Sequence, residues 1–288
     1  MANSAPLHNN LIALLPASLQ EQLQNNFIQR CIAGAVLALA SMWAIWISPN
    51  LFPVYVWFFI LIAVREWQRM AEPEQFRESV HYLYSFILLI ACVQALFGTR
   101  AGFAVLVVVP LLLWMIATQI KLAHPLRFAC SILYLGAAPL SLIALNQNYT
   151  IGAEIVTYYF GVVWATDTAA YIIGRRVGGS LLAPDVSPKK TWSGFIGGTI
   201  AGTVVGIILG LILDTGHILE TLVLSLVLSL VAQFSDLFQS KIKRLYNVKD
   251  TGGIIPGHGG VLDRVDSLML SAPLYAFLQF IAHRALPW

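Results

Sequence analysis

The chain has 288 residues, of which 58% are apolar and only 11% are charged, and its formal net charge is +3. Because an average soluble domain has about 25% charged residues, this chain has too few charges to cover a surface that faces water. The composition therefore excludes an ordinary soluble protein and predicts that lipid is the main solvent. The small net charge does not indicate nucleic acid as a partner, and we expect none.

The first 30 residues precede the first long apolar stretch. Between Leu11 and Phe27, Leu15, Leu19 and Leu23 recur at helical spacing, which is typical of an amphipathic helix that lies on a membrane surface. We expect no secretory signal, because the first apolar stretch contains nothing that resembles a small-residue cleavage site.

Nine apolar stretches are candidates for membrane-spanning helices, which need about 20 apolar residues each. They are predicted at 31–48, 51–64, 81–98, 101–120, 128–146, 151–174, 192–213, 217–240 and 265–283. The second stretch is short, so a re-entrant hairpin across Ser48-Pro49-Asn50 is an alternative for the first two. The sequence thus predicts an all-α polytopic membrane protein with an amphipathic segment at 1–30 and an amino-terminal transmembrane bundle at 31–150. We expect the carboxyl-terminal transmembrane domain, at 151–288, to be the catalytic one.

Basic residues are distributed unevenly between the two ends of these nine stretches. With the amino terminus inside, 15 of the 17 lysines and arginines fall on the inner side, and only Arg100 and Arg284 fall on the outer side. Inner loops of membrane proteins are enriched in Lys and Arg. We therefore expect a bacterial inner-membrane protein with a cytoplasmic amino terminus, a cytoplasmic site and an outer carboxyl terminus.

The seventh stretch has a glycine at every fourth position. These residues are Gly194, Gly198, Gly202, Gly206 and Gly210. Such a ridge allows another helix to approach closely. It fits a rigid core that bears a site and equally fits a contact between two copies of the chain, so a homodimer stays an open alternative.

Four aspartates lie near the inner ends of three predicted spans. They are Asp167, Asp236, and the pair Asp263 and Asp266 at the start of the ninth span. Ionisable side chains inside a membrane are costly and are usually functional. Because Asp263 and Asp266 are three residues apart, the helical period predicts that they share one face. The alternative interpretation is that each aspartate caps a helix or pairs with a nearby base.

Two inner loops combine basic residues with glycine or proline. In the loop that ends at residue 264, Gly257, Gly259 and Gly260 permit close backbone approach before a helix start, an arrangement that suits phosphate. Together with flanking aspartates it predicts a site where carboxylates hold Mg²⁺ and basic side chains hold phosphate oxygens. His258 fits a general base, a hydrogen-bond donor to phosphate or a loop residue that bonds to the backbone, and we favour the hydrogen-bond donor to phosphate. Ser187-Pro188-Lys189-Lys190 predicts a second phosphate-binding segment. Membrane anchoring is the alternative for both loops.

These residues resemble the phosphatidate cytidylyltransferases, also called CDP-diacylglycerol synthases. The family signature is matched, at the family spacing, by Ser240, Lys243-Arg244, Lys249-Asp250, His258-Gly259-Gly260 and Asp263-Arg264-Val265-Asp266. A second family block is matched by Asp167, Ala170-Tyr171, Gly174-Arg175 and the segment from Ser187 to Thr191. The resemblance covers the chain from about residue 160 onward, whereas the first half matches only in its pattern of spans.

The resemblance implies an Mg²⁺-dependent reaction of CTP with phosphatidate that gives CDP-diacylglycerol and pyrophosphate for phospholipid biosynthesis. One or two Mg²⁺ ions, and a monovalent cation, are both compatible with it. It implies that the metal ligands are Asp236 and Asp263, and that the catalytic residues are these two with Lys243 and Arg264. The implied substrate-binding residues are Ser187, Lys189, Lys190, Ser240, Arg244, Lys249, Asp250, His258, Gly259, Gly260, Asp167 and Tyr171.

Two positions depart from the family pattern. Gln239 and Ser193 stand where the family usually has glutamate. If those acids support the metal, its affinity should be weaker here by about 10–100-fold per lost partner. The departures leave open a divergent paralogue that acts on another lipid phosphate. A CTP-dependent lipid kinase, and an ion-coupled transporter with Asp167 and Asp236 on its ion path, are further alternatives.

Overall fold

The computed structural model describes residues 26–48, 50–147, 151–254 and 259–281, and this part of the chain forms nine α-helices and one short β-hairpin. The helices are α3 (Asn26–Ile47), α4 (Leu51–Ala71), α5 (Phe76–Phe97), α6 (Thr99–Gln119), α7 (Pro125–Asn146), α8 (Gly152–Val177), α9 (Trp192–Ile212), α10 (Ile218–Leu245) and α11 (Leu268–Ile281). Each predicted apolar stretch corresponds, in order, to one helix. The amphipathic helix predicted within residues 1–30 lies outside the described residues up to residue 25.

Six helices are long and apolar enough to cross a membrane: α4, α5, α6, α7, α9 and α10. The chain is therefore an integral membrane protein. The apolar parts of α3 and α11 are shorter, at Gly34–Ile47 and Leu268–Ile281. Helix α8 has 26 residues but carries Glu154, Asp167 and two arginines. The prediction of nine spans is supported for six helices, and for the other three it stays a prediction.

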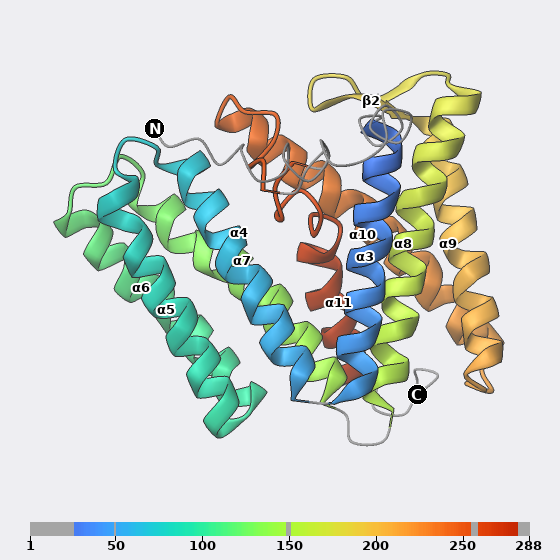
Figure 1. Cartoon of the computed structure of the whole chain (residues 1–288), viewed down its shortest axis with the longest axis horizontal. Coiled ribbons are helices and arrows are strands. Elements are labelled where there is room, and N and C mark those ends of the chain that lie inside the picture. Colours follow the sequence, from blue (N-terminus) through green and yellow to red (C-terminus); the bar gives the residue numbers. More distant parts are fainter. Residues whose placement is uncertain (1–25, 49, 148–150, 255–258, 282–288) are drawn as a thin grey trace, which may run out of the picture.

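Successive helices run in alternating directions, so their connections gather at two ends of the molecule (Figure 1). The connections that follow α4, α6, α8 and α10 lie at one end, which we call the basic end. The lysines and arginines of these predicted inner loops lie at this end, whereas Arg100 lies at the other, at the start of α6. The geometry thus agrees with the charge count, and which side of a membrane the basic end faces stays a prediction.

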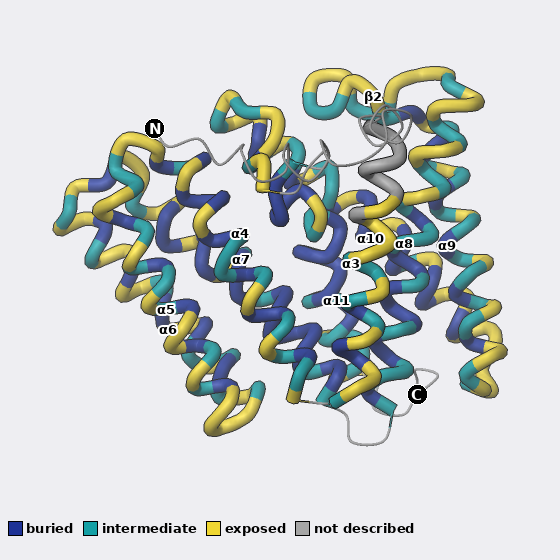
Figure 2. The backbone as a smooth tube through the Cα atoms, viewed as in Figure 1, coloured by how far each residue is buried: buried dark blue, intermediate teal, exposed yellow. Residues whose placement is uncertain are grey.

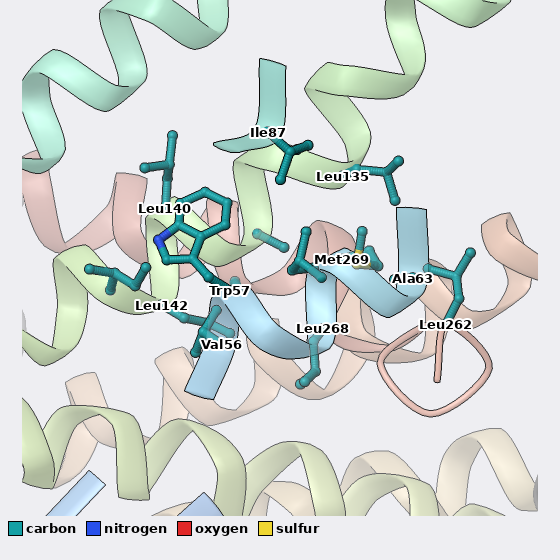
Figure 3. Close-up of a cluster of buried hydrophobic side chains, with 14 of the residues drawn as sticks. Val56, Trp57, Ala63, Ile87, Leu135, Leu140, Leu142, Leu262, Leu268 and Met269 are labelled. Atoms are coloured by element: carbon teal, nitrogen blue, oxygen red, sulfur yellow. The ribbon is translucent and has the colours of Figure 1, made fainter. Parts of the chain in front are cut away.

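Many residues on the outer sides of the helices are exposed (Figure 2), and large apolar residues are among them. Leu96 of α5 is 75% exposed, Val107 of α6 is 74% exposed and Ile212 of α9 is 71% exposed. Apolar surface of this extent is a liability in water and suits lipid acyl chains. Inside, α4, α7 and α11 contribute a buried cluster that includes Trp57, Leu135 and Met269 (Figure 3).

The glycine ridge of α9 packs against α8 and α10 within the same chain. All five glycines are buried. A Cβ atom on Gly198 would lie 2.8 Å from the carbonyl oxygen of Thr166, and one on Gly202 would overlap the hydroxyls of Thr166 and Ser229. Because the ridge already holds two helices of its own chain, the structure supports the core interpretation. A homodimer then needs some other surface.

One inner loop forms a hairpin, and one local prediction was wrong. The inner loop that contains Ser187 to Lys190 is an antiparallel hairpin of β1 (Leu181–Ala183) and β2 (Ser187–Thr191), whereas the other described elements are helices, in agreement with the predicted all-α class. Residues 261–267 form turns, and α11 begins only at Leu268. Asp263 and Asp266 therefore do not share a helical face. The contacts of Asp263 with loop amides, described below, explain why the helix starts late.

Candidate active site

Three carboxylates from three elements meet near the basic end: Asp167 of α8, Asp236 of α10 and Asp266 of the turn before α11. We call them the acid cluster. They lie close enough for the charge of Asp236 to act on both of the others. Lys190 of β2 offsets part of this repulsion, because its Nζ atom lies 2.6 Å from Oδ2 of Asp236. Three segments that are distant in sequence thus place acids and a base together.

Hydroxyl side chains fix the acid cluster in place. Ser267 donates to Oδ2 of Asp167 at 2.8 Å, and Ser240 donates weakly to Oδ1 of Asp236 at 3.4 Å. Oδ1 of Asp266 accepts the amide of Ser267 at 2.9 Å, in the turn that precedes α11. Ser235 of α10 donates to the carbonyl oxygen of Asp266. These hydrogen bonds therefore hold the acids where α8, α10 and the turn before α11 meet.

The hairpin is held above α10 by local contacts. Thr191 caps α9, because its Oγ1 accepts the amide of Gly194 at 3.1 Å. Arg244 of α10 donates through Nε to the carbonyl oxygen of Val186 at 3.2 Å. Since adjacent residues of a strand point to opposite faces, Lys190 turns toward Asp236 while Lys189 is exposed. The hairpin supplies one base to the cluster and another to the surface.

Asp263 lies in a separate, more buried environment. Its Oδ1 atom is 2.9 Å from Nζ of Lys243, and the two side chains are only 4% and 10% exposed. Its Oδ2 atom accepts the amides of Thr251 at 2.9 Å and Gly260 at 3.0 Å. A short polar side chain that binds backbone amides competes with helix formation. Asp263 therefore fixes the loop. The amide of Gly260, a residue predicted to lie against phosphate, donates to Asp263 in this structure.

Glu66 of α4 is a site residue that the sequence analysis missed. It is 2% exposed, and it accepts the amides of Val261 at 3.0 Å and Leu262 at 2.8 Å. The predicted second span ended at residue 64, which left Glu66 outside the membrane, where an acid needs no explanation. The signal was present nonetheless, because Glu66 is the one acidic residue within α4.

The two departures from the family pattern have clear positions. Gln239 is fully buried, and its Oε1 accepts the hydroxyl of Tyr134 from α7 at 2.6 Å. Its Nε2 has no hydrogen-bond partner among the described residues. Ser193 donates to the carbonyl oxygen of Gly178 at 2.5 Å and contacts Thr191, so it stabilises the base of the hairpin.

The remaining predicted substrate-binding residues lie around the same end. Tyr171 is exposed, and its hydroxyl accepts from Arg175 at 2.8 Å. Lys249 and Asp250 are exposed, Ser187 is half-buried in β2, and Gly259 is half-buried with a φ of 79°. Gly257 and His258 lie outside the described residues.

A cavity of about 540 Å³ opens beside the acid cluster. Its walls are mostly apolar and come from α3, α4, α7, α8 and α11, with residues such as Phe52, Leu142 and Phe160. Polar groups converge where Asp167, Thr168 and Arg264 line it. An apolar cavity with a few convergent polar groups is the usual form of a small-molecule site.

The chemistry of the acid cluster fits a divalent metal, although no three His, Cys, Asp or Glu side chains among the described residues are arranged to hold one alone. Mg²⁺ commonly takes one or two carboxylates together with substrate phosphates and water. Asp236 is a candidate ligand, since its side chain is 27% exposed and its contacts are Lys190 and a weakly bound hydroxyl. Asp263 could reach a metal only by exchanging its contacts with Lys243 and the loop amides.

Comparisons with known proteins bear on the family of the chain. A sequence profile of the cytidylyltransferase family matches residues 28–282. Two proteins named phosphatidate cytidylyltransferase, from Brucella suis and Brucella melitensis, are each 34% identical over 272 residues, which covers 91% of this chain and 97% of each relative. Another protein of that name, from Rickettsia bellii, is 40% identical over 148 residues, or 49% of this chain and 64% of the relative.

Proposed function

The chain belongs to the cytidylyltransferase family, and we propose that it transfers CMP from CTP to phosphatidate. It is a nucleotidyltransferase of phospholipid biosynthesis, and its products are CDP-diacylglycerol and pyrophosphate. The observation that carries this proposal is the apolar cavity lined at its polar part by Asp167 and Arg264, beside the Lys190–Asp236 ion pair.

The cavity suits the lipid substrate. Phosphatidate has two apolar chains and a phosphate monoester, and the cavity offers apolar walls from five helices and a guanidinium at Arg264. Arginine presents planar donors that match phosphate oxygens. The acyl chains can therefore stay among the helices while Arg264 holds the phosphate next to the acid cluster.

The basic end suits the nucleotide. Lys190 and the exposed Lys189 project from the hairpin, Arg244 joins the hairpin to α10, and Lys249 is exposed in the following loop. These groups can bind the triphosphate on the water side, while the lipid phosphate approaches from the cavity. Such positioning is a large part of catalysis in phosphoryl transfer.

The reaction forms one bond and breaks one. An oxygen of the phosphatidate phosphate attacks the α-phosphorus of CTP, and the bond from that phosphorus to the bridging oxygen of the β-phosphate breaks, so that pyrophosphate leaves. The attacking phosphate is already largely deprotonated near neutral pH, so no strong general base is required. Lys190 and Arg264 offset the negative charges that this approach brings together.

Magnesium is the cofactor that the donor set supports, with Asp236 as its principal protein ligand and Asp167 or Asp266 nearby. When bound, Mg²⁺ would neutralise phosphate charge at the transferring group. The contacts of Asp263 instead favour a loop-fixing role, so we assign the metal to Asp236. Lys243 then serves as the partner of Asp263.

Orientation and span number complete the proposal. We place the basic end on the cytoplasmic side of a bacterial inner membrane, where CTP is available, and we place all nine helices across or deep within the bilayer. The basic loops support this orientation. Cysteine variants at Lys121 and Asp214, which lie at opposite ends, should react with a membrane-impermeant thiol reagent from opposite sides.

The test of function uses the purified full chain in detergent with phosphatidate, Mg²⁺ and CTP labelled in its α-phosphate. We expect labelled CDP-diacylglycerol and an equal amount of pyrophosphate. Release of CDP with phosphorylated lipid would indicate a lipid kinase instead. Absence of lipid-linked CMP, under conditions where the Brucella suis relative is active, would refute the proposal.

A further inference from the structure

Glu66, in the amino-terminal half of the chain, contacts residues 251–252 and 260–262 of the loop between α10 and α11. Its two carboxylate oxygens accept the amides of Val261 and Leu262, and Thr251 Oγ1 lies 3.5 Å from Oε2. The contact joins residues that are 195 and 196 positions apart in sequence. Leu262 is fully buried and belongs to the same apolar cluster as Ala63 of α4 (Figure 3).

Two glycines of the loop are required by this contact. The three atoms nearest to a Cβ on Gly252 would all belong to Glu66, the closest at 2.7 Å. A Cβ on Gly260 would lie 2.5 Å from Oε2 of Glu66. By contrast, a Cβ on the neighbouring Gly253 would meet nothing within 4 Å. The loop therefore folds closely around a carboxylate of α4.

The contact controls the residues that follow it. Val261 and Leu262 open the turns that lead to α11, and the amide of Arg264 bonds back to the carbonyl oxygen of Val261 at 2.9 Å. These turns deliver Arg264 to the cavity and Asp266 to the acid cluster. A shift of the 261–262 amides would thus displace a phosphate-binding base and a cluster acid together.

We propose that Glu66 is a positioning residue, which acts through the amides of Val261 and Leu262 to place Arg264 and Asp266 for the transfer reaction. The inference rests on the proposed function. It gives the amino-terminal half a direct part in the site, beyond its contribution of cavity walls. Glutamine at this position has the same shape, but its amide nitrogen would face a backbone donor, and it carries no charge.

The first experiment compares Glu66→Gln with Glu72→Gln in the full chain. Glu72 is a matched acid at the end of the same helix and is 8% exposed. Burial raises the pKa of its carboxyl, and His124 and Arg127 lower that pKa again, so it belongs to another contact network. Because a displacement of about 1 Å can cost about 100-fold in rate, we expect kcat of Glu66→Gln to fall by roughly 10- to 100-fold per folded molecule. Glu72→Gln should keep the wild-type kcat.

A double-mutant cycle tests the contact itself. Gly252→Ala should lower kcat in the wild-type chain and should have no further effect in Glu66→Ala, where its methyl group has room. Gly253→Ala should be neutral in both backgrounds. If the effects of Gly252→Ala and Glu66→Ala multiply as independent changes do, or if kcat per folded molecule stays at the wild-type value in Glu66→Gln, the proposal is wrong.

Amide hydrogen exchange separates this inference from the proposed function. Exchange of the peptide that contains Val261 and Leu262 should accelerate in Glu66→Gln and stay unchanged in Glu72→Gln. If the wild-type chain makes no CDP-diacylglycerol, the proposed function fails, and this exchange pattern alone supports or overturns the loop contact. Unchanged exchange in Glu66→Gln would overturn the inference even if the enzyme is active.

Discussion

The buried ion pair between Lys243 and Asp263 gives a prediction that decides between two roles of Asp263. In Asp263→Asn, Lys243 keeps its charge but loses its partner, and the new amide group must face either Lys243 or the amides of Thr251 and Gly260. Both side chains of the pair are at most 10% exposed, so solvent screens the loss little. Breaking one partner of a buried pair costs about 3–5 kcal/mol, and we expect the free energy of unfolding to fall by that amount.

The second variant removes the stranded charge. Lys243→Met has nearly the same shape, so Asp263→Asn with Lys243→Met should recover about 1–3 kcal/mol relative to Asp263→Asn alone, in line with the coupling of contacting residues. Unfolding followed by tryptophan fluorescence, in micelles titrated with a denaturing detergent, measures the four free energies. Strictly additive changes would refute the ion-pair account.

Turnover of the same double variant then reports on the metal. If Asp263 only fixes the loop, the double variant should regain activity in step with its stability. A stable double variant that stays inactive and needs more Mg²⁺ would show that Asp263 ligates the metal, as the family resemblance implies, and that our assignment to Asp236 alone is wrong.

Three further predictions concern packing, the metal and the lipid. Gly202→Ala should destabilise the fold by about 1–3 kcal/mol, because the added methyl group overpacks the contact with α8 and α10. Gly34→Ala should not destabilise the fold, since a Cβ atom there would meet nothing within 4 Å, and equal unfolding curves for the two variants would contradict this. Gln239→Glu restores the usual family acid, so the Mg²⁺ concentration for half-maximal activity should fall about 10-fold. An unchanged Mg²⁺ concentration would show that residue 239 does not contribute to metal binding. Leu142→Trp narrows the cavity, so KM for phosphatidate should rise while KM for CTP stays constant, and a rise in both would argue against a lipid cavity.

The sequence predicts the helices well because each apolar stretch is a local signal. A helix that spans the bilayer needs about 20 apolar residues in succession, so the apolar stretches of the sequence directly predict the order of the nine helices. The acid cluster was partly predictable for a related reason. Asp167 and Asp236 are rare charges in apolar segments, and alternating spans place such residues at one end.

The parts that could not be predicted depend on contacts between distant segments. Nothing near Glu66 in the sequence shows that it binds the amides of Val261 and Leu262, almost 200 residues later. The environment of Asp263 was misjudged because its side chain prefers loop amides to a helical position. The hairpin at 181–191 was hidden by Pro184 and Pro188, which favour a loop when only local preferences are considered.

The measurement that tests the account most directly is turnover of Asp236→Asn beside its affinity for CTP. Asparagine keeps the size of the side chain but loses the charge that faces Lys190 and the proposed metal. We predict that transfer of CMP to phosphatidate falls below detection while the folded protein still binds CTP. A variant that turns over at the wild-type rate with the wild-type Mg²⁺ requirement would contradict the assignment of the acid cluster as the active centre.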